Sequence, residues 1–516
     1  MLTKSEIQSF RQCPRKLWLE RNAKEIPPEF DAGGDRRMRE GIAVGNMARM
    51  ALGPGVVWPM SEASKQDAAE LAKAMLAANP HAPGVEVPFF HNEVYARADA
   101  MLPMPSGYVL RETKASAFPL KSDKTTPGKP DKDYVADLAI QMYLAEESGY
   151  PIIEAQLNLL DSQWRYPGKG DYSKMFRVLN ATKEVREEVA KVPGWIADAK
   201  RVLNGPMPQM VSGSQCSKPQ GCGYLEHCKK LDPPKVPHPI ELLPGSAGKG
   251  LAKKLKEAQG YLSILEPKPH EFTGSNAKLY ERMQKCHRTG QAFLSPNSMD
   301  ELQELPYPRY YFDFEGIDLA VPVWQGVRPY EQIPFQWSCH IERQPGVFEH
   351  AEFLDLTGND PSLDCIEAML RCLDAKCAGP ILVYYAAYER GRIEELAQRH
   401  PMYRDEMEAF VHRLVDLHPM VQEHYYHPAM EGSFSIKKVL PVMAPDLSYG
   451  DLTEVTDGTE AQLAYIRAAL DPNVTAQQKA ETEANARKYC RQDTWAMVVV
   501  AYFLQQMPRP LRPASM

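Results

Sequence analysis

The stretch YYFDFE, residues 310–315, places two carboxylates in a segment that the sequence predicts as a β-strand. Residues two apart in a strand point to the same face, so Asp313 and Glu315 project together. Further along the chain, Tyr489 and Asp493 are four apart on a predicted helix and share one of its faces. Grouped carboxylates of this kind hold catalytic divalent metal ions in proteins. We therefore expect a metal site built from these two segments.

The surrounding sequence predicts an α/β domain over residues 306–516. Strands are predicted at residues 310–315, 335–341, 347–354 and 381–385, with a helix before the last of them and helices beyond it. Strands first, then helix, strand and helix, is the order of a ribonuclease-H-like fold. The D-x-E and Y-x3-D patterns resemble those of DEDDy exonucleases. That resemblance implies that four acidic groups hold two metals and that Tyr489 orients the attacking water.

The remaining acidic ligand of this second site has two candidates. The segment ILVYYAAYE, residues 381–389, has the expected place but offers Glu389 where aspartate is usual. A glutamate keeps the charge and reaches one methylene further. Asp416, in LVDL, is the other candidate. The segment GSFSIKK, residues 432–438, also resembles this family.

A separate carboxylate cluster is predicted in the N-terminal part of the chain. Glu112 and Lys114 are two apart on a predicted strand, and Asp99 ends the strand before it. Two carboxylates can hold Mg²⁺ or Mn²⁺, and a neighbouring lysine can orient water and stabilise charge on a phosphate. The spacing D-x12-E-x-K, with Glu86 upstream, resembles the PD-(D/E)XK nuclease motif. Gln141, on the following helix, resembles the glutamine that these nucleases place beside the lysine.

This first domain is expected to span residues 1–230 and to have a restriction-endonuclease-like α/β fold. RecB-like members of the superfamily often carry a histidine ligand on an early helix. The comparable stretch here, residues 41–46, contains none. Either the metal is held without it or the site is weaker.

Four cysteines lie at the two ends of the first domain. One cysteine near the N-terminus and three at the C-terminal end resemble the iron–sulfur staple of AddB-type and CRISPR-associated RecB-like nucleases, which implies a [4Fe–4S] cluster. A zinc site is the main alternative, although zinc sites usually contain C-x2-C knuckles and none is present. Unliganded cysteines are the third interpretation. The four residues are Cys13, Cys216, Cys222 and Cys228.

Composition places the chain among globular proteins, with 44% hydrophobic and 25% charged residues. The net charge of -7 argues against a protein that coats nucleic acid through bulk positive potential, but clustered carboxylates explain part of it. No apolar run reaches the ~18 residues needed to span a bilayer, and no secretory signal is visible, so we expect a cytoplasmic location and no membrane partner. The Pro- and Gly-rich stretch after residue 230 predicts a linker that leads into a helical segment, residues 231–305.

The whole pattern resembles a bacterial family that fuses a RecB-like iron–sulfur nuclease domain to a DEDD-type domain. The implied function is metal-dependent, exonucleolytic cleavage of nucleic acid, with DNA favoured over RNA and with single-stranded or end-containing substrates favoured. A nucleic-acid-binding scaffold with one or both sites inactive is the alternative. A redox or sensor protein built on the cluster is a third class. Protein partners, cleavage polarity and pathway are not encoded in these motifs.

Overall fold

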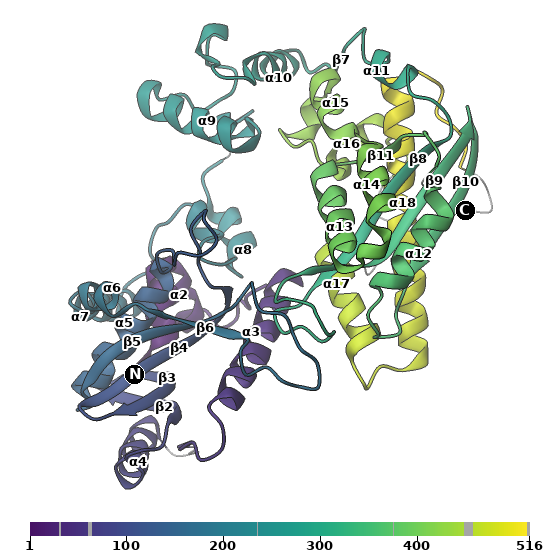
Figure 1. The fold of residues 1–516 in the computed structure, drawn as a ribbon. Coiled ribbons are helices and arrows are strands. Elements are labelled where there is room, and N and C mark those ends of the chain that lie inside the picture. Colours follow the sequence, from purple (N-terminus) through teal and green to yellow (C-terminus); the bar gives the residue numbers. More distant parts are fainter. Residues whose placement is uncertain (30–31, 60–63, 235, 375, 448–457, 513–516) are drawn as a thin grey trace. The chain divides into compact units, whose positions relative to one another are not determined.

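The computed structural model is a mixed α/β structure, as the sequence predicts, with a six-stranded, a five-stranded and a two-stranded sheet in its described part (Figure 1). None of the described helices combines the length and the apolar character that a membrane span requires. The chain divides into two compact units, Met1–Pro233 with Asp318–Glu331, and Pro234–Ile317 with Gln332–Met516. The described residues are 1–29, 32–59, 64–234, 236–374, 376–447 and 458–512.

The first unit is built on the six-stranded sheet. Strands β2, β3 and β4 form an antiparallel meander, β5 runs parallel to β4, and β6 and the short β1 complete the sheet. The turn between β2 and β3 is made by Asn92 and Glu93, both at positive φ (46° and 61°), as a tight two-residue hairpin requires. The strands are β1 (Leu2–Thr3), β2 (Gly84–His91), β3 (Val94–Met104), β4 (Gly107–Ala117), β5 (Ile152–Leu160) and β6 (Phe176–Asn180).

Helix α5 (Lys132–Glu147) connects β4 to β5 and is the central helix of this unit. Asp131 caps it by accepting hydrogen bonds from the backbone N–H groups of Asp133 and Tyr134. Its middle is buried on all sides, with Leu138, Ile140 and Met142 fully inaccessible. The other helices are α1 (Lys4–Gln12), α2 (Pro14–Asn22), α3 (Ala32–Ala51), α4 (Lys65–Ala78), α6 (Thr182–Val189), α7 (Val192–Asn204), α8 (Leu225–Leu231) and the 3-10 turn η1 (Ser214–Cys216).

A segment distant in sequence, residues 318–331, also belongs to the first unit. Tyr166 donates its backbone N–H to the Val327 carbonyl at 2.9 Å, and the Tyr172 hydroxyl donates to the Pro322 carbonyl at 3.0 Å. Arg36 on α3 pairs with Asp318. These bonds explain why the segment is grouped with residues 1–233, and the sequence does not signal them.

The second unit is built on the five-stranded sheet, in the order β10-β9-β8-β11-β12. Strand β8 is central, β10 is antiparallel to β9, and β11 is parallel to both β8 and β12. A small antiparallel pair, β7 with β13, lies apart from this sheet. The strands are β7 (Phe293–Leu294), β8 (Arg309–Asp318), β9 (Gln332–Gln344), β10 (Val347–Leu354), β11 (Ile381–Val383), β12 (Leu414–Asp416) and β13 (Tyr425–Tyr426).

Helix α18 is the longest described helix and packs along β9. Thr475 and Gln478 begin it with reciprocal capping bonds. The helices of this unit are α9 (Gly245–Gln259), α10 (Ala277–Thr289), α11 (Asp300–Gln303), α12 (Ser362–Leu373), α13 (Ala386–Arg399), α14 (Arg404–His412), α15 (Leu417–His424), α16 (Ile436–Met443), α17 (Gly458–Tyr465) and α18 (Ala476–Leu504). Short helical turns are η2 (Ile240–Leu242), η3 (Pro269–Glu271), η4 (Pro401–Tyr403), η5 (Pro428–Met430) and η6 (Ile466–Leu470).

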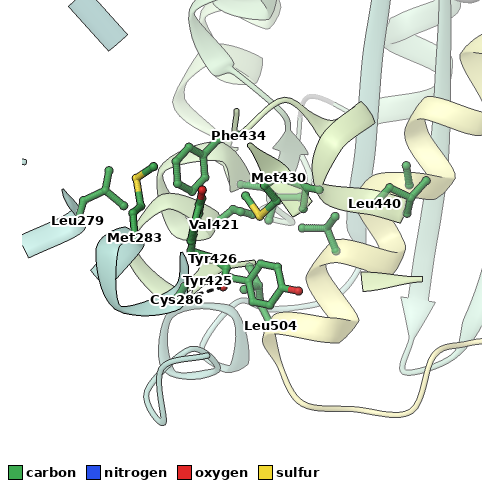
Figure 2. Packing of buried hydrophobic residues seen from close by; sticks show 14 of the residues in the cluster. Leu279, Met283, Cys286, Val421, Tyr425, Tyr426, Met430, Phe434, Leu440 and Leu504 are labelled. Carbon is green, nitrogen blue, oxygen red and sulfur yellow. Dashed lines mark hydrogen bonds between the residues drawn. The ribbon is translucent and has the colours of Figure 1, made fainter. Parts of the chain in front are cut away.

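The expected linker and the helical segment after it contribute buried side chains, from Ile240 to Leu302, to the core of the second unit. Ile240 and Leu243 are fully buried within the Pro-rich stretch. Figure 2 shows Leu279 and Met283 of α10 in the same buried cluster as Tyr426. Prolines in this stretch precede helical turns, where a fixed φ and a missing N–H are tolerated, so they mark helix starts here and not a free linker.

Candidate active sites

Three carboxylates meet in the second unit. Asp313 and Glu315 come from the central strand β8, and Asp493 comes from α18. One carboxylate oxygen from each lies within 4.8 Å of the others. Glu315 and Asp493 are each only 8% exposed. Burial and the charges of the other members raise the pKa of Asp313 and of Glu315 well above the usual range. Such a group is strongly stabilised by a divalent cation.

Glu389, near the start of α13, adjoins this group. It is 2% exposed, and its Oε2 atom has no hydrogen-bond partner in the described part of the chain. Burial, followed by the charge of Asp313, raises the pKa of Glu389 well above normal. An ionised carboxylate buried without partners is costly, so this oxygen is suited to a cation.

Asp416 has a different role. Its Oδ1 atom accepts from the backbone N–H groups of Tyr385 and His418, and its Oδ2 atom accepts from Ala386, each at 2.9 Å. It therefore caps α15 and holds the first residues of α13. With both oxygens engaged by backbone donors, Asp416 fits a structural cap, and Glu389 is left as the fourth carboxylate.

Tyr489 and Lys437 complete the surroundings of the second site. Tyr489 is buried one turn before Asp493, and burial followed by the charge of Asp493 raises the pKa of its hydroxyl. The Lys437 ammonium lies 5.2 Å from the centre of the Tyr489 ring. Its positive charge lowers the pKa values of Asp313 and Glu315, but burial raises them by more, so both pKa values remain above normal. Sequence reasoning missed Lys437 as a site residue, although it lies within the GSFSIKK segment.

In the first unit, the side chains of β4 and α5 converge. Lys114 Nζ lies 2.8 Å from Glu112 Oε1, and Gln141 Nε2 donates to Glu112 Oε2 at 2.8 Å. Asp99 Oδ2 accepts from the backbone N–H of Thr113 at 2.8 Å. Burial, then the charges of Asp137 and Asp99, raise the pKa of Glu112 to about 7.

Two residues of this first site were not predicted. Asp137, four residues before Gln141 on α5, accepts from Lys114 Nζ at 2.5 Å. Lys4, at the start of α1, lies 2.9 Å from Asp137 and 3.4 Å from Glu112. Burial would raise the pKa of Asp137, but Lys114 and Lys4 outweigh it and hold that pKa far below normal. The i, i+4 spacing of Asp137 and Gln141 was available in the sequence, whereas no local signal identifies Lys4.

Glu86, a predicted catalytic residue of the first site, is held by two arginines. Arg49 of α3 holds one of its oxygens at 2.8 Å and Arg97 the other at 2.7 Å. Glu86, Arg49 and Asp99 line a cavity of about 240 Å³. Arg49 is the charged side chain that α3 contributes to the lining of this cavity.

The four predicted cysteines all belong to the first unit, and in the described residues no three of their sulfur atoms lie within 4.8 Å of one another. Burial raises the pKa values of the Cys222 and Cys228 thiols, and the thiols of Cys13 and Cys216 raise them further. The Cys222 N–H donates to the Cys216 carbonyl at 2.8 Å. Gln12, beside Cys13, donates to the carbonyls at both 215 and 220 and so joins the end of α1 to this segment.

A larger cavity, about 520 Å³, connects the first site with the cysteine-bearing segment. Lys114 and Asp137 line one part of it, and residues 219–221 with 223–224 line another. Arg11 from α1 and Lys16 from α2 also border it, so the lining combines basic side chains with the acidic Asp133 and Asp137.

Residues 310–435 match a family described as a domain of unknown function (DUF2779). The chain is also similar to the uncharacterized protein MG366 homolog of Mycoplasma pneumoniae, at 28% identity over 223 residues, 39% of this chain and 33% of the relative. The uncharacterized protein UU173 of Ureaplasma parvum is 22% identical over 240 residues, 43% of this chain and 34% of that relative. The chain thus spans about a third of the length of these curated relatives.

Proposed function

We propose that this protein is a metal-dependent nuclease that cleaves phosphodiester bonds of DNA, with single-stranded or end-containing DNA as the favoured substrate. The observation that carries the proposal is the buried group of Asp313, Glu315 and Asp493, whose oxygens lie within 4.8 Å of one another, with Glu389 beside them. Carboxylates concentrated in this way have no evident structural use, because their mutual repulsion and burial both oppose folding.

The fold around this group supports a ribonuclease-H-like, DEDDy-type assignment. The strand order β10-β9-β8-β11-β12, with β10 antiparallel to β9 and with β11 parallel to both β8 and β12, is compatible with that fold. Two divalent ions held by these carboxylates would activate a water molecule and stabilise the leaving oxygen. Tyr489 would orient that water through its hydroxyl, and Lys437 would offset negative charge brought by the phosphate.

The first unit supports a second nuclease site of PD-(D/E)XK type. Its β2-β3-β4 meander, crossover helix α5 and parallel β5 are the arrangement expected of that superfamily. Asp99 and Glu112 would hold Mg²⁺ or Mn²⁺, Gln141 would position Glu112, and Lys114 would stabilise charge on the phosphate. Asp137 would then keep Lys114 protonated and directed toward Glu112.

The four cysteines fit a [4Fe–4S] cluster that joins the two ends of the first unit. A tetrahedral zinc ion held by the same thiolates is the alternative. The placement of Cys13 at one end of the first unit and of the other three cysteines at its other end supports the cluster. Its contribution would be to folding, because metal–thiolate binding is coupled to it.

A second candidate is the scaffold with one site inactive, in which the first site binds nucleic acid and does not cleave it. The ion pairs of Lys4 and Lys114 with Glu112 and Asp137 favour it, because two ammonium groups already neutralise two of the carboxylates there. The Arg49–Glu86 pair acts in the same direction. The second site would then be the only nuclease centre.

The test is degradation of end-labelled single- and double-stranded DNA and RNA by the full chain, with Mg²⁺ or Mn²⁺, for the wild type, Lys114→Ala, Asp313→Asn and the double variant. Asp364→Asn, an exposed aspartate on α12, is the matched control. Two active centres predict partial loss in each single variant and complete loss in the double variant. Binding without cleavage in the wild type would replace the nuclease proposal with the scaffold.

A further inference from the structure

A third group of metal-type ligands lies in the second unit, away from the acidic group on β8. It consists of Glu301 on α11, and Glu423 and His424 at the C-terminal end of α15. One ligand atom from each residue lies within 4.8 Å of the others. The two glutamates are exposed and His424 is buried. Exposed acidic groups alone would carry no inference, so the argument depends on the histidine.

His424 is 8% exposed, and neither of its ring nitrogens has a hydrogen-bond partner in the described part of the chain. A buried polar atom without a partner costs about 1–3 kcal/mol, so an imidazole with two such atoms requires an explanation. Its Nε2 atom lies 3.6 Å from Glu301 Oε1. That separation is too long for a hydrogen bond. Two ligand atoms bound to one zinc ion at about 2.0–2.1 Å lie roughly 3.4 Å apart, close to the observed distance.

The backbone around His424 is held firmly. Its carbonyl accepts from Ser295 N–H at 2.8 Å, and the next residue, Tyr425, pairs with Leu294 of β7. Arg282 donates to the backbone carbonyls of Gln422, at 2.7 Å, and of Glu423. The guanidinium is thus directed at the helix end, where positive charge is favourable, and two of its N–H groups are engaged by carbonyls. A histidine on so fixed a backbone is preorganised as a ligand.

We propose that Glu301, Glu423 and His424 bind a divalent transition-metal ion of the zinc class. One imidazole nitrogen with two carboxylates suits zinc better than Mg²⁺, which prefers oxygen ligands alone. Water would complete the coordination, because both glutamates face solvent. The ion would tie the short helix α11 to the end of α15. This site is independent of the proposed nuclease centres.

The test is a zinc count on the full chain, stripped with chelator, incubated with Zn²⁺ and desalted, for the wild type, Glu301→Gln and His424→Gln. Glu304→Gln, an exposed glutamate beside α11, is the matched control. Because the cysteines and the other carboxylates are identical in all four proteins, differences between them report this site alone. Glu301 is exposed, so its substitution leaves the fold intact even if His424→Gln does not fold.

The expected result is one zinc fewer per chain in Glu301→Gln and in His424→Gln, with no change in Glu304→Gln. In a titration, loss of a direct ligand should weaken this one site by more than about tenfold, since even outer-shell partners are worth 10–100-fold. Zn²⁺ should also raise the thermal midpoint of the wild type more than that of Glu301→Gln, whereas Mg²⁺ should raise both equally. Equal zinc counts and equal zinc-induced shifts in the wild type and Glu301→Gln would overturn the proposal.

Discussion

Asp416→Ala and Glu389→Gln should have opposite effects, because one carboxylate caps helices and the other faces the acidic group. Asp416 accepts three backbone N–H bonds at 2.9 Å, two from the start of α13 and one from α15. Loss of one helix cap costs about 0.5–2 kcal/mol, and Asp416 serves two helices. We therefore expect Asp416→Ala to destabilise the second unit by about 1–4 kcal/mol.

Glu389→Gln should behave differently. The substitution keeps the volume and removes a buried charge that repels Asp313. We expect the stability of the metal-free protein to be unchanged or raised, and the stabilisation by Mn²⁺ to be lost together with nuclease activity. Glu389→Asp should retain activity, since it restores the aspartate that is usual at this position of the motif.

Thermal unfolding of each full-length variant, with chelator and with Mn²⁺, is the assay. A change of 1 kcal/mol moves the midpoint of a domain of this size by about 2–4 °C, so Asp416→Ala should lower it by about 2–16 °C with or without metal. Glu389→Gln should show no fall in chelator and a smaller shift with Mn²⁺ than the wild type. If Asp416→Ala abolishes the Mn²⁺ shift at unchanged metal-free stability while Glu389→Gln keeps it, the two roles are reversed and our assignment is wrong.

Three further predictions concern other parts of the molecule. Lys114→Ala should remove first-site cleavage and also destabilise the first unit by about 3–5 kcal/mol. The reason is that the buried Asp137 is left with Lys4 as its main counterion. Unchanged stability would contradict the buried ion-pair network. Cys222→Ser should release iron and sulfide from anaerobically purified protein. It should also destabilise the first unit by more than the ±0.5 kcal/mol of a surface change. A wild-type preparation that contains stoichiometric zinc and no iron would refute the cluster. Burial, and then the charge of His238, lowers the pKa of His287 from its usual 6.5 to about 4. The neutral form of His287 therefore stabilises the second unit above pH 6.5, and this contribution is lost as pH falls toward 4. His287→Gln should flatten that part of the pH–stability curve, and an unchanged curve would exclude the effect.

The sequence by itself determined those features of the sites that depend on local periodicity. Side chains two apart in a strand share a face, so the pairs Asp313 with Glu315 and Glu112 with Lys114 could be read without a structure. The helical spacing of Tyr489 and Asp493 is local in the same way. The mixed α/β character also followed from such patterns, because burying one face of a strand or helix imposes its period on the sequence.

Only the tertiary structure decided which distant residues join these pairs. Glu389 and Asp416 are equivalent as sequence candidates, and the backbone N–H groups that Asp416 accepts distinguish them. Lys4 reaches Glu112 across 108 residues of sequence, and Lys437 reaches the β8 carboxylates from α16. Such contacts depend on how separate elements pack, and a single sequence carries no periodic signal for packing partners. For the same reason, the sequence did not show that the expected linker and the helical segment after it belong to a core, whereas the apolar side chains of η2 and α10 lie in the core of the second unit.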